Sequence, residues 1–140
     1  MGLSAFAARW LAIGAALMLL GVVFGAFGAH VAAARLAPHD LDILRTGVTY
    51  QQFHALGLVL IASLARDTGE PGLLRVAARL LCVGIVVFSG SLYALAFGGP
   101  RVLGAITPLG GLAFLAGWAA LIWHALRVVR HPARSSSPDA

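Results

Sequence analysis

The stretch WLAIGAALMLLGVVFGAFGA, residues 10–29, decides the fold class of this protein. It contains no charged residue, and about 20 apolar residues are enough for a helix to cross roughly 30 Å of bilayer hydrocarbon. Similar stretches follow at residues 48–65, 76–97 and 107–126. Continuous apolar runs of this length predict helices, and they exclude the alternating strands of a membrane barrel. We therefore expect an all-α protein, a four-helix transmembrane bundle.

The composition agrees with a membrane protein. Of the 140 residues, 60% are hydrophobic and 11% are charged, whereas about 25% of the residues in a soluble protein are charged. A water-soluble domain of this size could not bury so much apolar surface. This balance excludes a soluble enzyme, a disordered chain and a disulfide scaffold, and the single Cys82 permits no intramolecular disulfide.

The chain divides into two parts. We expect one membrane domain over residues 1–128, and a disordered cytoplasmic tail over residues 129–140, because the end of the chain is rich in Ser and Pro. Between the first two spans, RLAPHDLDILRTG (residues 35–47) has an apolar and a polar side. This pattern favours a short interfacial helix, and the alternative is a plain connecting loop.

Two prolines suggest where helices begin. Pro38 is expected near the start of the interfacial helix, with His39 or Asp40 as its cap. Thr107 and Pro108 are expected as the N-cap and first residue of the fourth span.

The arginines indicate the orientation in the membrane. All ten basic residues are arginines, and the net charge is +5. Seven of them fall on one side of the four expected spans: Arg9, Arg66, Arg75, Arg79, Arg127, Arg130 and Arg134. Cytoplasmic loops carry the excess of positive charge, so both termini are expected in the cytoplasm. No nucleic-acid-binding motif is present, and no nucleic-acid partner is expected.

Uncharged polar residues gather in the outer halves of the expected helices. Thr46, Tyr50 and His54 are spaced four residues apart and so share one helix face. We predict one polar cluster that comprises His30, Thr46, Tyr50, Gln51, His54, Ser89, Ser91, Tyr93 and Thr107. Such a cluster either hydrogen-bonds neighbouring helices together or forms a ligand, metal or proton site.

Glycines indicate where helices approach closely. Gly14, Gly21 and Gly28 recur every seven residues, and Gly21 with Gly25 forms GxxxG. Small residues let helix backbones come together in lipid. The glycines expected to mediate packing are Gly21, Gly25, Gly28, Gly57, Gly90, Gly110 and Gly111.

No pattern for chemistry stands out. The sequence has no HExxH, CxxCH or GxSxG motif and no carboxylate within an expected span. We therefore expect no catalytic residue, no enzyme activity, no metal ligand and no cofactor. One alternative is kept open, in which His30 and His54 bind a haem or a metal ion.

Five short motifs follow one another along the chain. They are GAFGAH (25–30), TGVTYQQFHALGL (46–58), FSGSLY (88–93), ITPLGG (106–111) and GW (117–118). Together they resemble the domain-of-unknown-function 423 family of small multi-pass membrane proteins. The resemblance extends over most of the chain and implies no established activity.

These observations lead to one main functional hypothesis and two alternatives. The main one is a structural or accessory protein of a bacterial inner membrane, in contact with lipid and with another membrane protein or a second copy of itself. The first alternative is a small transporter or channel-like module with its polar site in the outer half of the bundle. The second is a haem- or metal-binding accessory protein.

Overall fold

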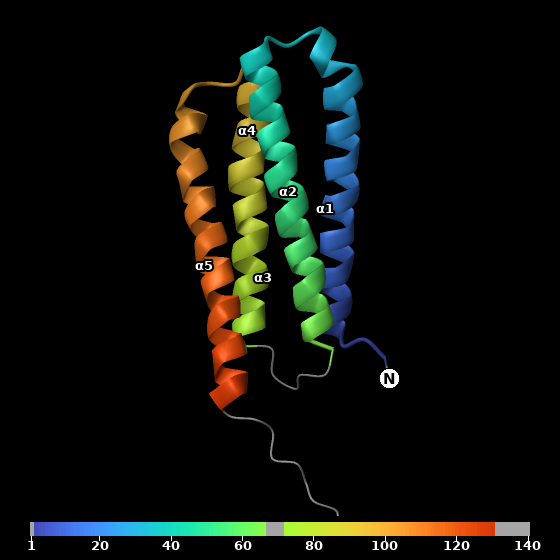
Figure 1. Ribbon diagram of the computed structural model, residues 1–140, viewed down its shortest axis with the longest axis vertical. Helices are drawn as coiled ribbons and strands as arrows, with labels where there is room; N and C mark the ends of the chain where they lie inside the picture. Colours follow the sequence, from blue (N-terminus) through green and yellow to red (C-terminus); the bar gives the residue numbers. More distant parts are fainter. Residues whose placement is uncertain (1, 67–71, 131–140) are drawn as a thin grey trace, which may run out of the picture.

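The computed structural model describes residues 2–66 and 72–130 (Figure 1). In order, the elements are α1 (Ala5–His30), a 3₁₀ turn η1 (Ala32–Ala34), α2 (Pro38–Leu64), α3 (Gly72–Gly84), the π-helical η2 (Ile85–Ser89), α4 (Gly90–Ala96) and α5 (Val102–Arg130). The described residues form only helices, turns and short connections.

The helices make four rods, because α3, η2 and α4 follow one another without a break from residue 72 to residue 96. Three rods are long and apolar enough to cross a membrane: α1 with η1, the α3–α4 rod and α5. The fourth, α2, has 27 residues and is therefore about 40 Å long. It is more polar than the others and lies between α1 and the α3–α4 rod (Figure 1). The expected four-helix membrane bundle is confirmed.

The bundle has a central pair of rods and two edges. Helix α2 packs along the α3–α4 rod, α1 packs mainly on α2, and α5 packs mainly on α3 and η2. Figure 1 shows α1 and α5 at opposite edges of the molecule. As a result, α1 and α5 direct large apolar side chains outward, including Leu19 and Leu115, which are 66% and 68% exposed. In a bilayer these side chains contact lipid.

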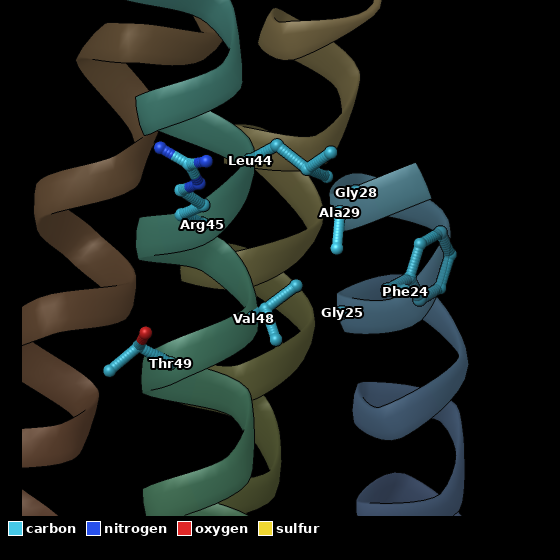
Figure 2. Close-up of a pocket in the computed structure, with 8 residues that line it drawn as sticks. All are labelled: Phe24, Gly25, Gly28, Ala29, Leu44, Arg45, Val48 and Thr49. Carbon is cyan, nitrogen blue, oxygen red and sulfur yellow. The ribbon is translucent and has the colours of Figure 1, made fainter. Parts of the chain in front are cut away.

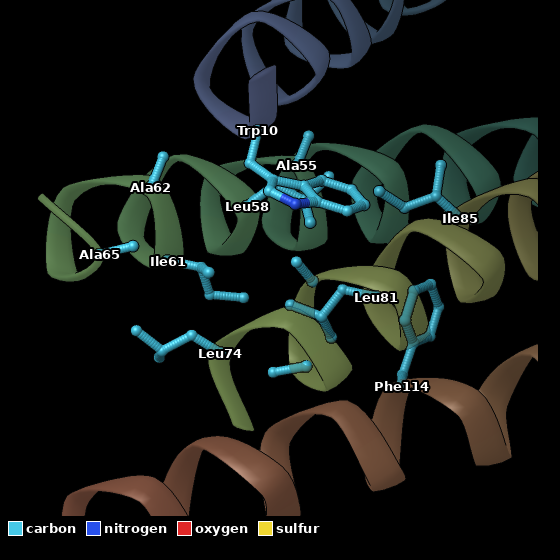
Figure 3. Packing of buried hydrophobic residues seen from close by; sticks show 12 residues of the cluster. Trp10, Ala55, Leu58, Ile61, Ala62, Ala65, Leu74, Leu81, Ile85 and Phe114 are labelled. Atoms are coloured by element: carbon cyan, nitrogen blue, oxygen red, sulfur yellow. The ribbon is translucent and has the colours of Figure 1, made fainter. Parts of the chain in front are cut away.

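The main core lies in the half of the bundle near the N-terminus. Trp10 of α1 and Phe114 of α5 close it from the two edges, around the buried Leu58 and Leu81 of the central pair (Figure 3). A smaller cluster of Leu41, Leu44, Ala32 and Ala96 closes the opposite end. The two clusters join all four rods.

The segment between the first two spans differs from the sequence expectation. No separate interfacial helix forms, because α2 starts at Pro38 and continues to Leu64. Its first turns bury Leu41 and Leu44 in the bundle, so this apolar side belongs to the core. Pro38 does occupy the helix start, but the N-cap is Ala37 without a side-chain hydrogen bond. The expectation that His39 or Asp40 caps this helix is therefore wrong.

The fourth span also begins earlier than expected. Helix α5 starts at Val102, so Thr107 is not an N-cap, and Pro108 lies inside the helix. The chain reverses before α5 at Gly98, whose φ of +84° is in the left-handed region that glycine adopts readily. After this turn, residues 102–106 contain no helix breaker except Gly104. Helix α5 ends at Arg130, two residues later than the expected domain boundary, and the rest of the expected tail, residues 131–140, lies outside the described residues.

Candidate functional site

The predicted polar cluster separates into three groups. One joins α1, α2 and α4 through Gln51, one joins α4 and α5 through Ser91, and one lies between α2 and α5 around His54. Two predicted members lie apart from all three. His30 is exposed at the end of α1, and exposed Thr46 donates its hydroxyl hydrogen to the Asp42 carbonyl of its own helix at 2.9 Å.

Gln51 connects three helices. Its Nε2 donates to the Leu17 carbonyl oxygen of α1 at 2.7 Å, and its Oε1 accepts from the Tyr93 hydroxyl of α4 at 2.8 Å. The Gln51 side chain reaches α1 because Gly21 lies beside it, with the Gln51 Nε2 only 3.6 Å from where a Gly21 Cβ would stand. Both ends of this buried amide are therefore used within the bundle.

Ser91 and Thr107 connect α4 to α5. Their hydroxyl oxygens are 2.7 Å apart, and each hydroxyl also contacts a carbonyl of its own rod, that of Phe88 or that of Leu103. Ser89 lies nearby in η2, and its fully buried hydroxyl has no hydrogen-bond partner among the described residues. The Ser91–Thr107 pair therefore acts as a contact between helices.

The third group lines an open groove between α2 and α5. His54 is only 8% exposed, and its Nδ1 is 2.7 Å from the Tyr50 carbonyl oxygen. Its ring stacks on Phe114 with centroids 3.4 Å apart. The Tyr50 and Phe88 rings are tilted by 30° with centroids 4.5 Å apart, and Trp118 also lines the groove. The groove is open to the surface of the bundle between α2 and α5.

The structure does not bring His30 and His54 together. Gly28 of α1 contacts Leu44 of α2, and His54 lies ten residues beyond Leu44, which is about 15 Å along the helix. His30 follows Gly28 in the opposite direction. Two nitrogens on one metal ion each lie about 2 Å from it, so these histidines cannot ligate the same ion. Among the described residues, no three His, Cys, Asp or Glu side chains are grouped to hold a metal.

The seven-residue glycine repeat faces α2 along its whole length. A Cβ at Gly14 would lie 3.0 Å from the Ala55 carbonyl oxygen, and one at Gly21 would lie 2.8 Å from Gln52 Cγ. At Gly28 the nearest atom would be Leu44 Cδ2 at 3.3 Å. A seven-residue repeat keeps one face of a helix against its neighbour, as in coiled coils.

The other predicted glycines differ in how tightly they pack. Gly57 and Gly110 make close contacts, with Leu81 and with the Phe88 backbone, respectively. Gly25 and Gly111 have only ordinary contacts, at 3.5 and 3.9 Å. No atom lies within 4 Å of a Cβ at Gly90, so the expectation that Gly90 mediates packing is wrong.

Near the C-terminal end of α1, the small residues Gly25, Gly28 and Ala29 leave a cavity of about 160 Å³ against α2. Figure 2 shows Leu44 and Val48 directed from α2 toward the stretch of α1 that holds Gly25, Gly28 and Ala29. The cavity contains more apolar than polar surface and has no titratable group other than Arg45, whose guanidinium pairs with exposed Asp42 at 3.3 Å. We assign it to helix packing.

Several contributors to these groups were not predicted. Phe88, Phe114 and Trp118 form the aromatic wall of the groove, but in the sequence they are ordinary aromatic residues of apolar runs. Gly84 and Gly117 face Phe114 and Leu81, respectively. The seven-residue spacing of Gly110 and Gly117 matches the repeat in α1 and could have indicated the second of these.

The sequence motifs coincide with the helix contacts. Residues of 25–30 contact residues of 46–58 through Gly25 and Val48, and residues of 46–58 contact residues of 88–93 through Gln51 and Tyr93. Residues of 88–93 contact residues of 106–111 through Ser91 and Thr107. A family model described as "Protein of unknown function (DUF423)" matches residues 24–111, which contain these four motifs. The chain belongs to the DUF423 family.

Curated relatives agree with this membership. The UPF0382 membrane protein YwdK of Bacillus subtilis is 44% identical over 115 residues, which is 82% of this chain and 94% of the relative. The UPF0382 inner membrane protein YgdD of Escherichia coli K12 is 38% identical over 109 residues, 78% of this chain and 82% of the relative. No solved structure matches the chain. This DUF423 chain is a membrane protein, and the names of its relatives state no activity.

Proposed function

We propose that this DUF423 protein is a non-catalytic accessory protein of a bacterial inner membrane, which binds another membrane protein through a lipid-facing edge helix. The observation that carries the proposal is the use of the polar residues. Gln51, Tyr93, Ser91 and Thr107 hydrogen-bond helices to one another inside the chain, so these groups serve packing. The Escherichia coli relative is named as an inner membrane protein, which supports the location.

The outward surface is where a partner would bind. Helices α1 and α5 each pack mainly against one central rod, and the opposite side of each is covered by apolar side chains. Association within lipid depends on close packing and hydrogen bonds rather than on removal of apolar surface from water. Either edge helix therefore offers a surface for a second transmembrane helix without any change in the bundle.

The arginines support cytoplasmic termini. Arg9 and Arg75 lie near the starts of α1 and α3, Arg66 follows the end of α2, and Arg127 is in the last turn of α5. These four helix ends lie at the same end of the bundle (Figure 1). An excess of arginine marks the cytoplasmic side. Cysteine labelling from outside intact cells tests this orientation: a cysteine at residue 2 is expected to stay unlabelled, and one at the exposed residue 100, between α4 and α5, to react.

Site-specific photo-crosslinking tests the accessory role. A photoreactive amino acid is placed at Leu19 on α1 or at Leu115 on α5, whose exposures of 66% and 68% are similar and which belong to opposite edges of the bundle. We expect one position to yield a defined protein adduct and the other, its matched control, to yield lipid adducts. Lipid adducts alone at both positions, together with isolation of a lone monomer in mild detergent, would contradict the proposal.

A further inference from the structure

The groove between α2 and α5 has the size and surface of a small-molecule site. Its volume is about 520 Å³, within the roughly 300–1,000 Å³ typical of ligand pockets. His54 and Tyr50 line it from α2, and Phe114 and Trp118 line it from α5. Pro108, within α5, borders it as well.

Two hydrogen-bonding groups of this site are not used within the bundle. The Tyr50 carbonyl can only accept, so His54 Nδ1 carries the proton, and Nε2 is left as an acceptor. In the described part of the chain, neither Nε2 nor the Tyr50 hydroxyl has a hydrogen-bond partner. Nε2 is not among the fully buried atoms, and Tyr50 is 42% exposed. The groove thus presents one acceptor and one donor beside stacked aromatic rings.

The depth of the groove restricts what can reach it. Arg45 of α2 and Arg66, two residues past the end of α2, are 21 positions apart, which corresponds to about 30 Å of helix and is close to the thickness of the hydrocarbon core. His54 is nine residues from Arg45, about 14 Å along the axis, which places it near mid-depth. An ionisable residue at this depth is rare and usually functional. A ligand for it must dissolve in the membrane.

The surface beyond Trp118 is aliphatic. Trp118 also borders two neighbouring grooves, of about 490 and 670 Å³, which follow α2 and α5 toward the end of the bundle near the termini. Their walls include Leu60, Leu64 and Ile122. An aromatic compartment with two polar groups thus adjoins a long apolar surface.

We propose that this groove binds the hydroxylated ring of a membrane-soluble hydroquinone, with its apolar tail along the aliphatic surface beyond Trp118. Flat rings stack favourably on aromatic side chains. A ring hydroxyl donates to His54 Nε2 and can accept from Tyr50, whereas the carbonyl oxygen of an oxidised quinone only accepts. The site therefore binds the reduced ring more tightly than the oxidised one. This inference is independent of the proposed protein partner.

Ligand-dependent thermal stability tests the site. The full chain in detergent is heated with decyl-benzoquinone, its hydroquinone or decylbenzene, and the folded fraction is followed by size-exclusion chromatography. Each variant is compared with its own ligand-free melting temperature, so a change in intrinsic stability cancels. We expect the hydroquinone to raise the melting temperature, with binding about tenfold tighter than that of the quinone, as for the loss of one hydrogen bond.

Four variants locate the binding. Tyr50→Phe and His54→Phe each remove one polar group and keep a ring, so each is expected to weaken hydroquinone binding about tenfold. Gly111→Leu fills the groove and is expected to abolish binding, because Gly111 lines it. Tyr93→Phe, outside the groove, is the matched control and is expected to bind as the unaltered chain does.

Three results would overturn the inference. They are no hydroquinone-dependent rise in the full chain, an equal rise with decylbenzene, or equal binding by Tyr50→Phe and the unaltered chain. The second of these would show adsorption of an apolar tail only. If His54→Phe fails to fold, Tyr50→Phe and Gly111→Leu still decide the question.

Discussion

The α1–α2 interface makes a prediction that separates two readings of the same glycines. The GxxxG motif would give Gly21 and Gly25 equal importance, whereas the structure assigns the contact to the seven-residue repeat Gly14, Gly21 and Gly28. The variants Gly14→Ala and Gly25→Ala distinguish these readings. Each adds one methyl group to α1 at a position that faces α2.

The magnitudes follow from the space at each position. A methyl group at Gly14 would stand 2.9 Å from Val59 Cγ2 and 3.0 Å from the Ala55 carbonyl oxygen, so the two backbones must separate. Overpacking of this kind costs about 1–3 kcal/mol, against at most about 1 kcal/mol gained by alanine in a helix. We expect Gly14→Ala to lower the unfolding free energy by about 1–2 kcal/mol, a fall in Tm of roughly 3–8 °C.

Gly25→Ala is the matched control. Its methyl group would lie 3.5 Å from Val48 Cγ1, an ordinary van der Waals contact. We expect the stability to stay the same or to rise by up to about 1 kcal/mol. A thiol-reactive dye reports unfolding in detergent through the half-buried Cys82, the single thiol of the chain. Equal losses in the two variants, or a larger loss in Gly25→Ala, would refute the assignment of the interface.

The same thermal assay tests three further features. Gln51→Leu removes two interhelical hydrogen bonds and is expected to lower the unfolding free energy by about 1–2 kcal/mol. The double variant with Tyr93→Phe measures the coupling between Gln51 and Tyr93, and full additivity of the two losses would argue against the hydrogen bond between these side chains. Thr107→Val should lower the unfolding free energy by about 0.6–2 kcal/mol, while Thr107→Ser, which keeps the hydroxyl, should change it by only a few tenths of a kcal/mol. Equal stability of the two variants would contradict the role of the hydroxyl. Gly90→Ala should be neutral or stabilising by up to about 1 kcal/mol, and a marked loss would show a contact at that position.

The sequence was most informative about the rods. Apolar length identified four helices, because lipid leaves a backbone few alternatives to a helix. The boundaries were less accessible. Pro108 resembles a helix start locally, yet it lies inside α5, and prolines are tolerated within membrane helices when neighbouring groups satisfy the backbone. The start of α2 was hidden because Leu41 and Leu44 have the same pattern on an interfacial helix as on a core helix.

The candidate site was predictable in its residue types but not in its grouping. Spacing placed Tyr50 and His54 on one face, and the structure puts both in the groove. Spacing within one helix could not show that Gln51, one residue from Tyr50, turns to α1 and α4 instead. Nor could it select Phe114, because its stacking on His54 depends on how α5 packs across the bundle.

Native mass spectrometry of the chain released from its own membrane tests the central claim most directly. In the proposed role, the polar residues mostly join the helices, and the lipid-facing surface of an edge helix binds a partner. This role predicts a complex of fixed stoichiometry that contains this 14.5 kDa chain and a second membrane protein. A mass that corresponds to the lone chain in every preparation would contradict it.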